Sequence, residues 1–109
     1  MTSEGTARWT VTVETVDGFT RSTNVLERVA DGIEADRRAL GPAFSLDAKR
    51  GVVSATFQVE AQGPGGAADA GIDVFYRALA AAGYDVERPG WKLLLEVEPS
   101  VDEESPVPA

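Results

Sequence analysis

The stretch FSLDAKRGVVSATFQVEA, residues 44–61, decides the fold of this chain. Apolar and polar residues alternate over Phe44–Ala48 and again over Val52–Ala61, as they do in β-strands with one buried face. The two runs are separated by Lys49-Arg50-Gly51, and glycine readily adopts the positive φ that a short hairpin loop requires. We therefore predict a β-hairpin in the middle of the chain.

A strand and a helix flank this hairpin on each side. Upstream, an alternating run over Arg8–Val16 is followed by a helical periodicity over Val25–Leu40. Downstream, a second helical run over Ala67–Ala82 is followed by an alternating run over Trp91–Glu98. The predicted order is β-α-β-β-α-β, and right-handed crossovers then place the first and third strands at the centre of one sheet.

This order resembles the ferredoxin-like superfold over residues 8–98. The resemblance implies an α+β, two-layer sandwich in which two helices cover one face of a four-stranded antiparallel sheet. It extends to the fold alone, because the superfold hosts enzymes, ligand-sensing domains, RNA binders and assembly modules. Residues 1–7 are predicted to be a flexible N-terminus. Residues 99–109 are predicted to be an acidic, proline-containing disordered tail, with a short docking motif as the alternative.

Local signals place the ends of the first helix. Start signals occur at Ser22, Thr23 and Asn24, and Asn24 followed by Glu27 resembles a capping box. Gly41-Pro42 is a stop signal. Glu34 and Arg38 are spaced to form an ion pair on the exposed side. Its buried residues are expected to be Leu26, Val29, Ile33 and Leu40.

The second helix is expected to end at Gly83, a residue suited to the left-handed conformation after a helix. Its buried residues are expected to be Ala68, Ile72, Phe75, Leu79 and Ala82. Trp9 and Trp91 alternate in phase with core residues and are predicted to pack there.

Composition excludes several classes of chemistry. The chain of 109 residues has no cysteine and no histidine, so disulfides, thiolate catalysis, the usual general base and the commonest metal ligands are absent. We accordingly predict no catalytic residue, no cofactor and no metal. The net charge of -8 argues against binding a nucleic-acid backbone. No signal peptide or membrane-spanning run is recognisable, so a cytoplasmic location is expected.

Two motifs carry weak functional signals. Gly63-Pro64-Gly65-Gly66 precedes a helix but lacks the spacing and the lysine of a phosphate-binding loop, so a linker is favoured over an anion site. Glu96 and Glu98 share one strand face, with Glu14 and Glu60 expected nearby. This group is typical of a solvated strand end, and metal binding or acid–base work is the alternative.

The sheet face without helices is the strongest candidate for function. It is rich in hydroxyl groups and lacks the aromatic platform on which RNA-binding sheets stack bases. A solvated surface, a wet interface with a second copy or another protein, and a small-molecule site all remain open, as does pairing along an edge strand. The candidate interface residues are Thr10, Thr12, Glu14, Thr56, Gln58 and Leu94, together with Tyr76 on the second helix.

We therefore expect a small acidic protein-association module, either a homodimer or the accessory partner of another bacterial protein. The preference for arginine over lysine and the abundance of alanine and glycine are the basis for a bacterial source. One alternative is a ligand-sensing regulatory domain that binds at a dimer seam. Another is a cofactor-free dimeric α+β barrel-like enzyme of the monooxygenase or cyclase type, disfavoured because the inward positions lack polar groups.

Overall fold

The computed structural model describes residues 6–20, 22–84 and 93–100. Residues 1–5, Trp91, Lys92 and most of the predicted tail, residues 101–109, lie outside the described residues. The predicted order of elements is confirmed. The elements are β1 (Ala7–Thr15), α1 (Thr23–Glu34), β2 (Leu40–Asp47), β3 (Val52–Ala61), α2 (Pro64–Ala81) and β4 (Leu93–Pro99).

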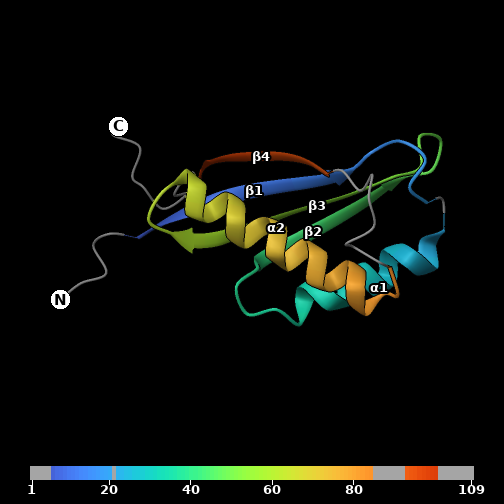
Figure 1. The fold of residues 1–109 in the computed structure, drawn as a ribbon, viewed down its shortest axis with the longest axis horizontal. Coiled ribbons are helices and arrows are strands. Elements are labelled where there is room, and N and C mark those ends of the chain that lie inside the picture. Colours follow the sequence, from blue (N-terminus) through green and yellow to red (C-terminus); the bar gives the residue numbers. More distant parts are fainter. Residues whose placement is uncertain (1–5, 21, 85–92, 101–109) are drawn as a thin grey trace, which may run out of the picture.

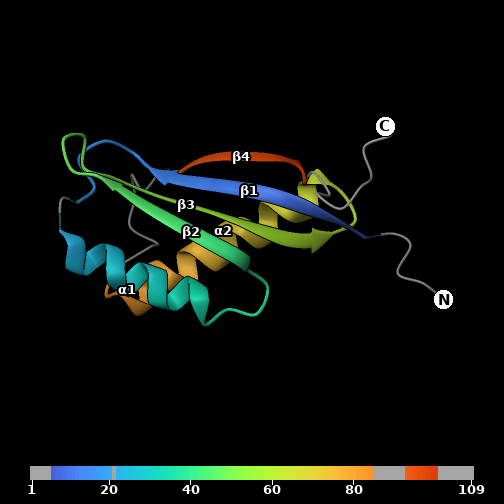
Figure 2. The same cartoon turned by 180° about the vertical axis from the view of Figure 1, so that it is seen from behind.

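The strands form one antiparallel sheet in the order β2-β3-β1-β4. Helix α2 packs on β1, β3 and β4, and α1 packs on β2 and α2. Figure 1 shows α2 in front of the strands, and Figure 2, from behind, shows the strands in front of α2. The ferredoxin-like, two-layer α+β fold is thus confirmed, with β1 and β3 at the centre of the sheet and β2 and β4 at its edges.

The first helix is shorter than the prediction, which extended it to Leu40. It ends at Glu34, because the side chain of Asp36 accepts a hydrogen bond from the backbone N–H of Arg38 at 3.0 Å and holds a local turn. Its N-cap is Ser22, whose hydroxyl accepts from the backbone N–H of Val25 at 3.4 Å, so the predicted Asn24 box is wrong.

Leu40 is the first residue of β2, opposite Gln58 of β3, rather than a residue of the helix. The register shifts between Leu40 and Ala43, and Gly41 lies within this bulge at φ +57°. The segment that the sequence marked as a helix stop is therefore part of a strand. The hairpin that follows is as predicted, with Gly51 at φ +69°.

The second helix ends as its sequence predicts. Gly83 has a φ of +99°, and the backbone N–H of Tyr84 reaches back to the carbonyl of Leu79 at 3.0 Å. Pro64 lies at its first turn, where the absent N–H is harmless. In the described part of the chain, neither helix has the length and hydropathy needed to cross a membrane.

The core lies between α2 and the two central strands. Phe57 of β3 and Phe75 of α2 are its largest side chains, and both are buried. The buried face of α2 is displaced from the prediction. Phe75 and Leu79 are buried as expected, but Gly71 and Ala78 take the places that Ile72 and Ala82 were expected to have.

Two glycines allow close packing of the layers. A Cβ atom at Gly71 would lie 2.5 Å from Val11 Cγ1, so α2 approaches β1 more closely than any side chain would permit. A Cβ atom at Gly32 would lie 2.9 Å from the Cα atom of Ala78, so α1 meets α2 almost backbone to backbone. Gly32 thus allows the close contact between the two helices.

Phe57→Ala should lower the free energy of unfolding by about 3–5 kcal/mol, because it opens a cavity in a core that excludes water. Ser54→Ala, on the opposite face of the same strand, is the control and should change it by less than about 1 kcal/mol. Urea unfolding followed by circular dichroism measures both. Equal stability of Phe57→Ala and the parent would contradict the inward orientation of β3 residues.

Gly71→Ala should lower the free energy of unfolding by about 1–3 kcal/mol, because the new methyl group collides with Val11. Gly65→Ala is the matched control in the same helix, since a Cβ atom there meets nothing within 4 Å. It should be neutral or stabilise by up to about 1 kcal/mol through helix propensity. The same unfolding measurement applies, and a more stable Gly71→Ala would refute the close approach.

Candidate functional site

One side of the sheet carries no helix in the described chain, and we call this side the open face (Figure 2). Six of the predicted interface residues lie on it in register. Thr10 is opposite Gln58, Thr12 is opposite Thr56, and Glu14 is opposite Leu94. The face as a whole comprises Arg8, Thr10, Thr12, Glu14, Ala43, Ser45, Asp47, Val52, Ser54, Thr56, Gln58, Glu60, Leu94, Glu96 and Glu98.

The centre of the open face is a group of half-buried hydroxyl and amide side chains. The hydroxyls of Thr12 and Thr56 share a hydrogen bond across β1 and β3, with 3.1 Å between their Oγ1 atoms. The hydroxyl of Thr10 is 2.7 Å from that of Ser100, which follows β4 directly. These bonds fix the side chains in rotamers and leave each oxygen a second lone pair for an outside donor.

Carboxylates surround this centre. Glu96 and Glu98 lie on the edge strand β4, Asp47 lies on the edge strand β2, and Glu60 lies at the end of β3. Arg8 is 3.6 Å from Glu60 in an exposed pair. The border of the open face is therefore acidic, and its long-range field favours cations.

The open face has little exposed apolar surface. Val52 belongs to this face by the alternation of β3 but is buried, with 3 % of its surface exposed. Leu94 remains 54 % exposed on β4, and Val16, just after β1, is 41 % exposed. A partner would thus meet one leucine among polar groups, which is the composition of a wet interface rather than of an obligate apolar one.

Tyr76 does not lie with the other predicted interface residues. It belongs to α2, on the opposite layer, and is half-buried against the core. Tyr84, at the end of the same helix, packs against Phe19 with 4.9 Å between ring centroids. The structure therefore separates the aromatic residues of the helix layer from the open face.

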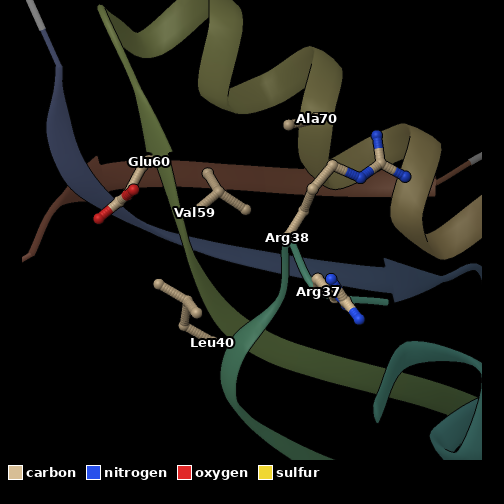
Figure 3. Close-up of a pocket in the computed structure, with 6 residues that line it drawn as sticks. All are labelled: Arg37, Arg38, Leu40, Val59, Glu60 and Ala70. Atoms are coloured by element: carbon tan, nitrogen blue, oxygen red, sulfur yellow. The ribbon is translucent and has the colours of Figure 1, made fainter. Parts of the chain in front are cut away.

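A second feature is a pocket of about 280 Å³ where the end of β3 meets the start of β2 and the side of α2 (Figure 3). Its apolar surface comes from Leu40, Val59 and Ala70, which belong to β2, β3 and α2. Its polar lining comes from Arg37, Arg38 and Glu60. Arg38 extends from the loop towards α2, and Glu60 lies on the other side of Val59.

Arg38 joins the loop after α1 to α2 through two carboxylates. Its guanidinium donates to both oxygens of Asp36, at 3.0 and 2.8 Å, and is 2.9 Å from an oxygen of Asp73. Arg77 also donates to Asp73, at 3.0 Å. The hydrogen bonds from Arg38 lower the pKa of both Asp36 and Asp73.

The sequence gives no indication of this pocket, and the predicted pairing of Arg38 with Glu34 is wrong. Arg38 was expected to meet Glu34 across one helical turn, but the helix ends before Arg38 is reached. The signal was present in Asp36-Arg37-Arg38, since an aspartate two residues before a backbone N–H favours a turn. The contact with Asp73 is between distant parts of the chain and has no local signal.

The structure adds no support for a binding site at either motif with a weak functional signal, the glycine-rich segment before α2 or the group of glutamates. Gly63 is the N-cap of α2, and its carbonyl accepts from the N–H of Ala67 at 3.0 Å, as an ordinary helix start does. Among residues 6–20, 22–84 and 93–100, no three acidic side chains gather closely enough to hold a metal ion. Glu14 faces Leu94 across the strands rather than a carboxylate.

Comparison with known proteins supports the fold. No protein-family model matches the chain, and no curated protein matches it. The solved structure of Rv0793 from Mycobacterium tuberculosis is similar, with a TM-score of 0.50 and 13 % identity, over 91 % of this chain and all of that one. At this identity the likeness concerns the arrangement of helices and strands alone.

Arg38→Met should lower the free energy of unfolding at neutral pH by about 0.5–1 kcal/mol, since the Arg38 side chain is 43 % exposed and water screens its ion pairs. The pKa values of Asp36 and Asp73 are lowered in the folded state. Their stabilisation is therefore complete above the ordinary carboxyl pKa and is lost as the pH falls through the lowered value.

The difference between parent and Arg38→Met should accordingly shrink towards zero as the pH falls to about 2. Urea unfolding at a series of pH values measures it. Arg28→Met, on the exposed side of α1, is the control and should show a small difference that does not vary with pH. A difference for Arg38→Met that persists in acid would show that the pairs with Asp36 and Asp73 do not stabilise the fold.

Proposed function

We propose that this chain is a protein-association module that binds a partner through the open face. The observation that supports the proposal is the composition of that face: a centre of hydroxyl and amide groups held in register, with a border of carboxylates. Both helices lie on the other side of the sheet. A four-stranded surface is then left for another molecule.

Charge complementarity favours a partner with a basic surface. The open face holds five carboxylates and one guanidinium, that of Arg8, which lies beside Glu60. Such a face attracts lysine and arginine side chains over several ångströms and speeds encounter with a basic protein. The central hydroxyls then bond to polar groups of the partner, directly or through water.

A second copy of the chain is the competing occupant, and one observation favours it. Hydroxyl groups both donate and accept, so the pair Thr12 and Thr56 is complementary to its own copy across a twofold axis. The border opposes this arrangement, because Glu96 and Glu98 of two copies would repel each other. We therefore place the basic partner first. We also propose a cytoplasmic location, consistent with a chain that contains no cysteine to oxidise.

The test combines charge reversal on the open face with a matched control. Glu96→Lys with Glu98→Lys reverses two charges on β4, and Thr12→Arg adds a bulky cation at the centre. Glu27→Lys with Glu34→Lys makes the same charge change on exposed positions of α1. A partner captured by the tagged parent chain from its source organism is purified, and its affinity for each variant is measured by calorimetry at two salt concentrations.

Both open-face variants should bind at least about tenfold more weakly, the α1 variant should bind like the parent, and binding should weaken with salt. Loss in the α1 variant alone would overturn the proposal. So would recovery of the bait alone, in which case sedimentation identifies the second copy as occupant if the chain is a dimer. That dimer should become tighter in Glu96→Lys with Glu98→Lys, because like charges are removed.

A further inference from the structure

The pocket beside Arg37 adjoins the open face, with which it shares Glu60, and has a chemistry of its own (Figure 3). Three elements meet there, and each contributes an apolar side chain to the wall, Leu40, Val59 and Ala70. Val59 is buried, whereas Leu40 and Ala70 are half-exposed, so solvent reaches part of this apolar wall. Its volume of about 280 Å³ suits a molecule smaller than most drug-sized ligands.

The two arginines of the pocket differ in what they have left to bind. Arg38 is already bonded to Asp36 and Asp73. Arg37 makes no hydrogen bond and no ion pair with any residue in the described part of the chain. A guanidinium has five N–H donors in a planar fork that matches a carboxylate, so Arg37 is the group with free capacity.

We propose that this pocket binds a small organic monocarboxylate, with its carboxylate on Arg37 and its hydrocarbon part on Leu40, Val59 and Ala70. Glu60 also lines the pocket, but its carboxylate points away from Arg38 (Figure 3) and lies 3.6 Å from Arg8. The apolar wall opposes a second charged group, so the pocket favours monocarboxylates over dicarboxylates and phosphates. Cationic and uncharged molecules of the same shape lack the attraction to Arg37.

The proposal is tested by NMR titration of the ¹⁵N-labelled full chain with hexanoate and with benzoate, one flexible and one flat. We expect shifts at the amides of Arg37, Leu40, Val59 and Ala70 and a dissociation constant on the order of 1 mM, as suits ligands of this size. Hexan-1-ol and hexylamine have the same hydrocarbon part without the carboxylate and should bind at least about tenfold more weakly.

Three variants locate the site. Arg37→Gln should weaken hexanoate binding about tenfold or more, and Ala70→Leu should weaken it by filling the apolar side of the pocket. Arg28→Gln removes the same charge from the exposed side of α1 and should bind like the parent. The amide spectrum of each variant reports whether it is folded.

Several results would overturn the proposal. These are an absence of shifts with both acids at roughly 20 mM, equal binding of hexanoate and hexan-1-ol, and unchanged affinity in a folded Arg37→Gln chain. Shifts confined to the open face would also overturn it. The open face and this pocket share Glu60 alone, and neither test substitutes that residue, so failure here leaves the association proposal to its own test.

Discussion

The close approach of α2 to β1 is the constraint on which the rest of the structure depends. A Cβ atom at Gly71 would lie only 2.5 Å from Val11 Cγ1, so the helix lies directly on the central strand and covers that side of the sheet. Gly32 allows a similarly close approach between α1 and α2, where its neighbour is Ala78. Dense packing of this kind fills the space between α2 and β1 with side chains.

Because the helices cover one side of the sheet, the residues on the other side face solvent and are mostly polar. Residues on β1 and β3 alternate between the sealed core and the open face, so Val11 and Val13 are buried while Thr10 and Thr12 meet solvent. Threonine suits this position because its methyl group packs on the strand and its hydroxyl stays hydrated or bonded. The Thr12–Thr56 hydrogen bond shows that the open face is ordered as well as polar, and such order would reduce the entropy cost of the proposed binding.

The strands and the hairpin were predictable because their signals are local. Alternation assigns Phe57 to the core, and Gly51 supplies the hairpin conformation, with no knowledge of distant residues. Leu40 shows where such reasoning ends. Its spacing continues the helical pattern of α1, but the turn at Asp36 and the pairing with Gln58 draw it into β2. At Leu40, strand pairing overrides the helical periodicity of the sequence.

The pocket could not be predicted for the same reason, since its walls come from three elements that only the fold brings together. The open-face residues were predictable as a group because strand register follows from alternation, although the burial of Val52 was not. A face that repeats along each strand is visible in sequence. A junction between a loop, a strand end and a helix is not.

Charge near the pocket runs against the charge of the chain as a whole. The net charge is -8, yet Arg38 and Arg77 are balanced by Asp36 and Asp73, which leaves the guanidinium of Arg37 as a local excess. At physiological ionic strength the screening length is about 8 Å, so an anion at the pocket responds to Arg37 rather than to acids on the far side of the sheet. An acidic chain can therefore attract cations on its open face and hold an anion beside α2.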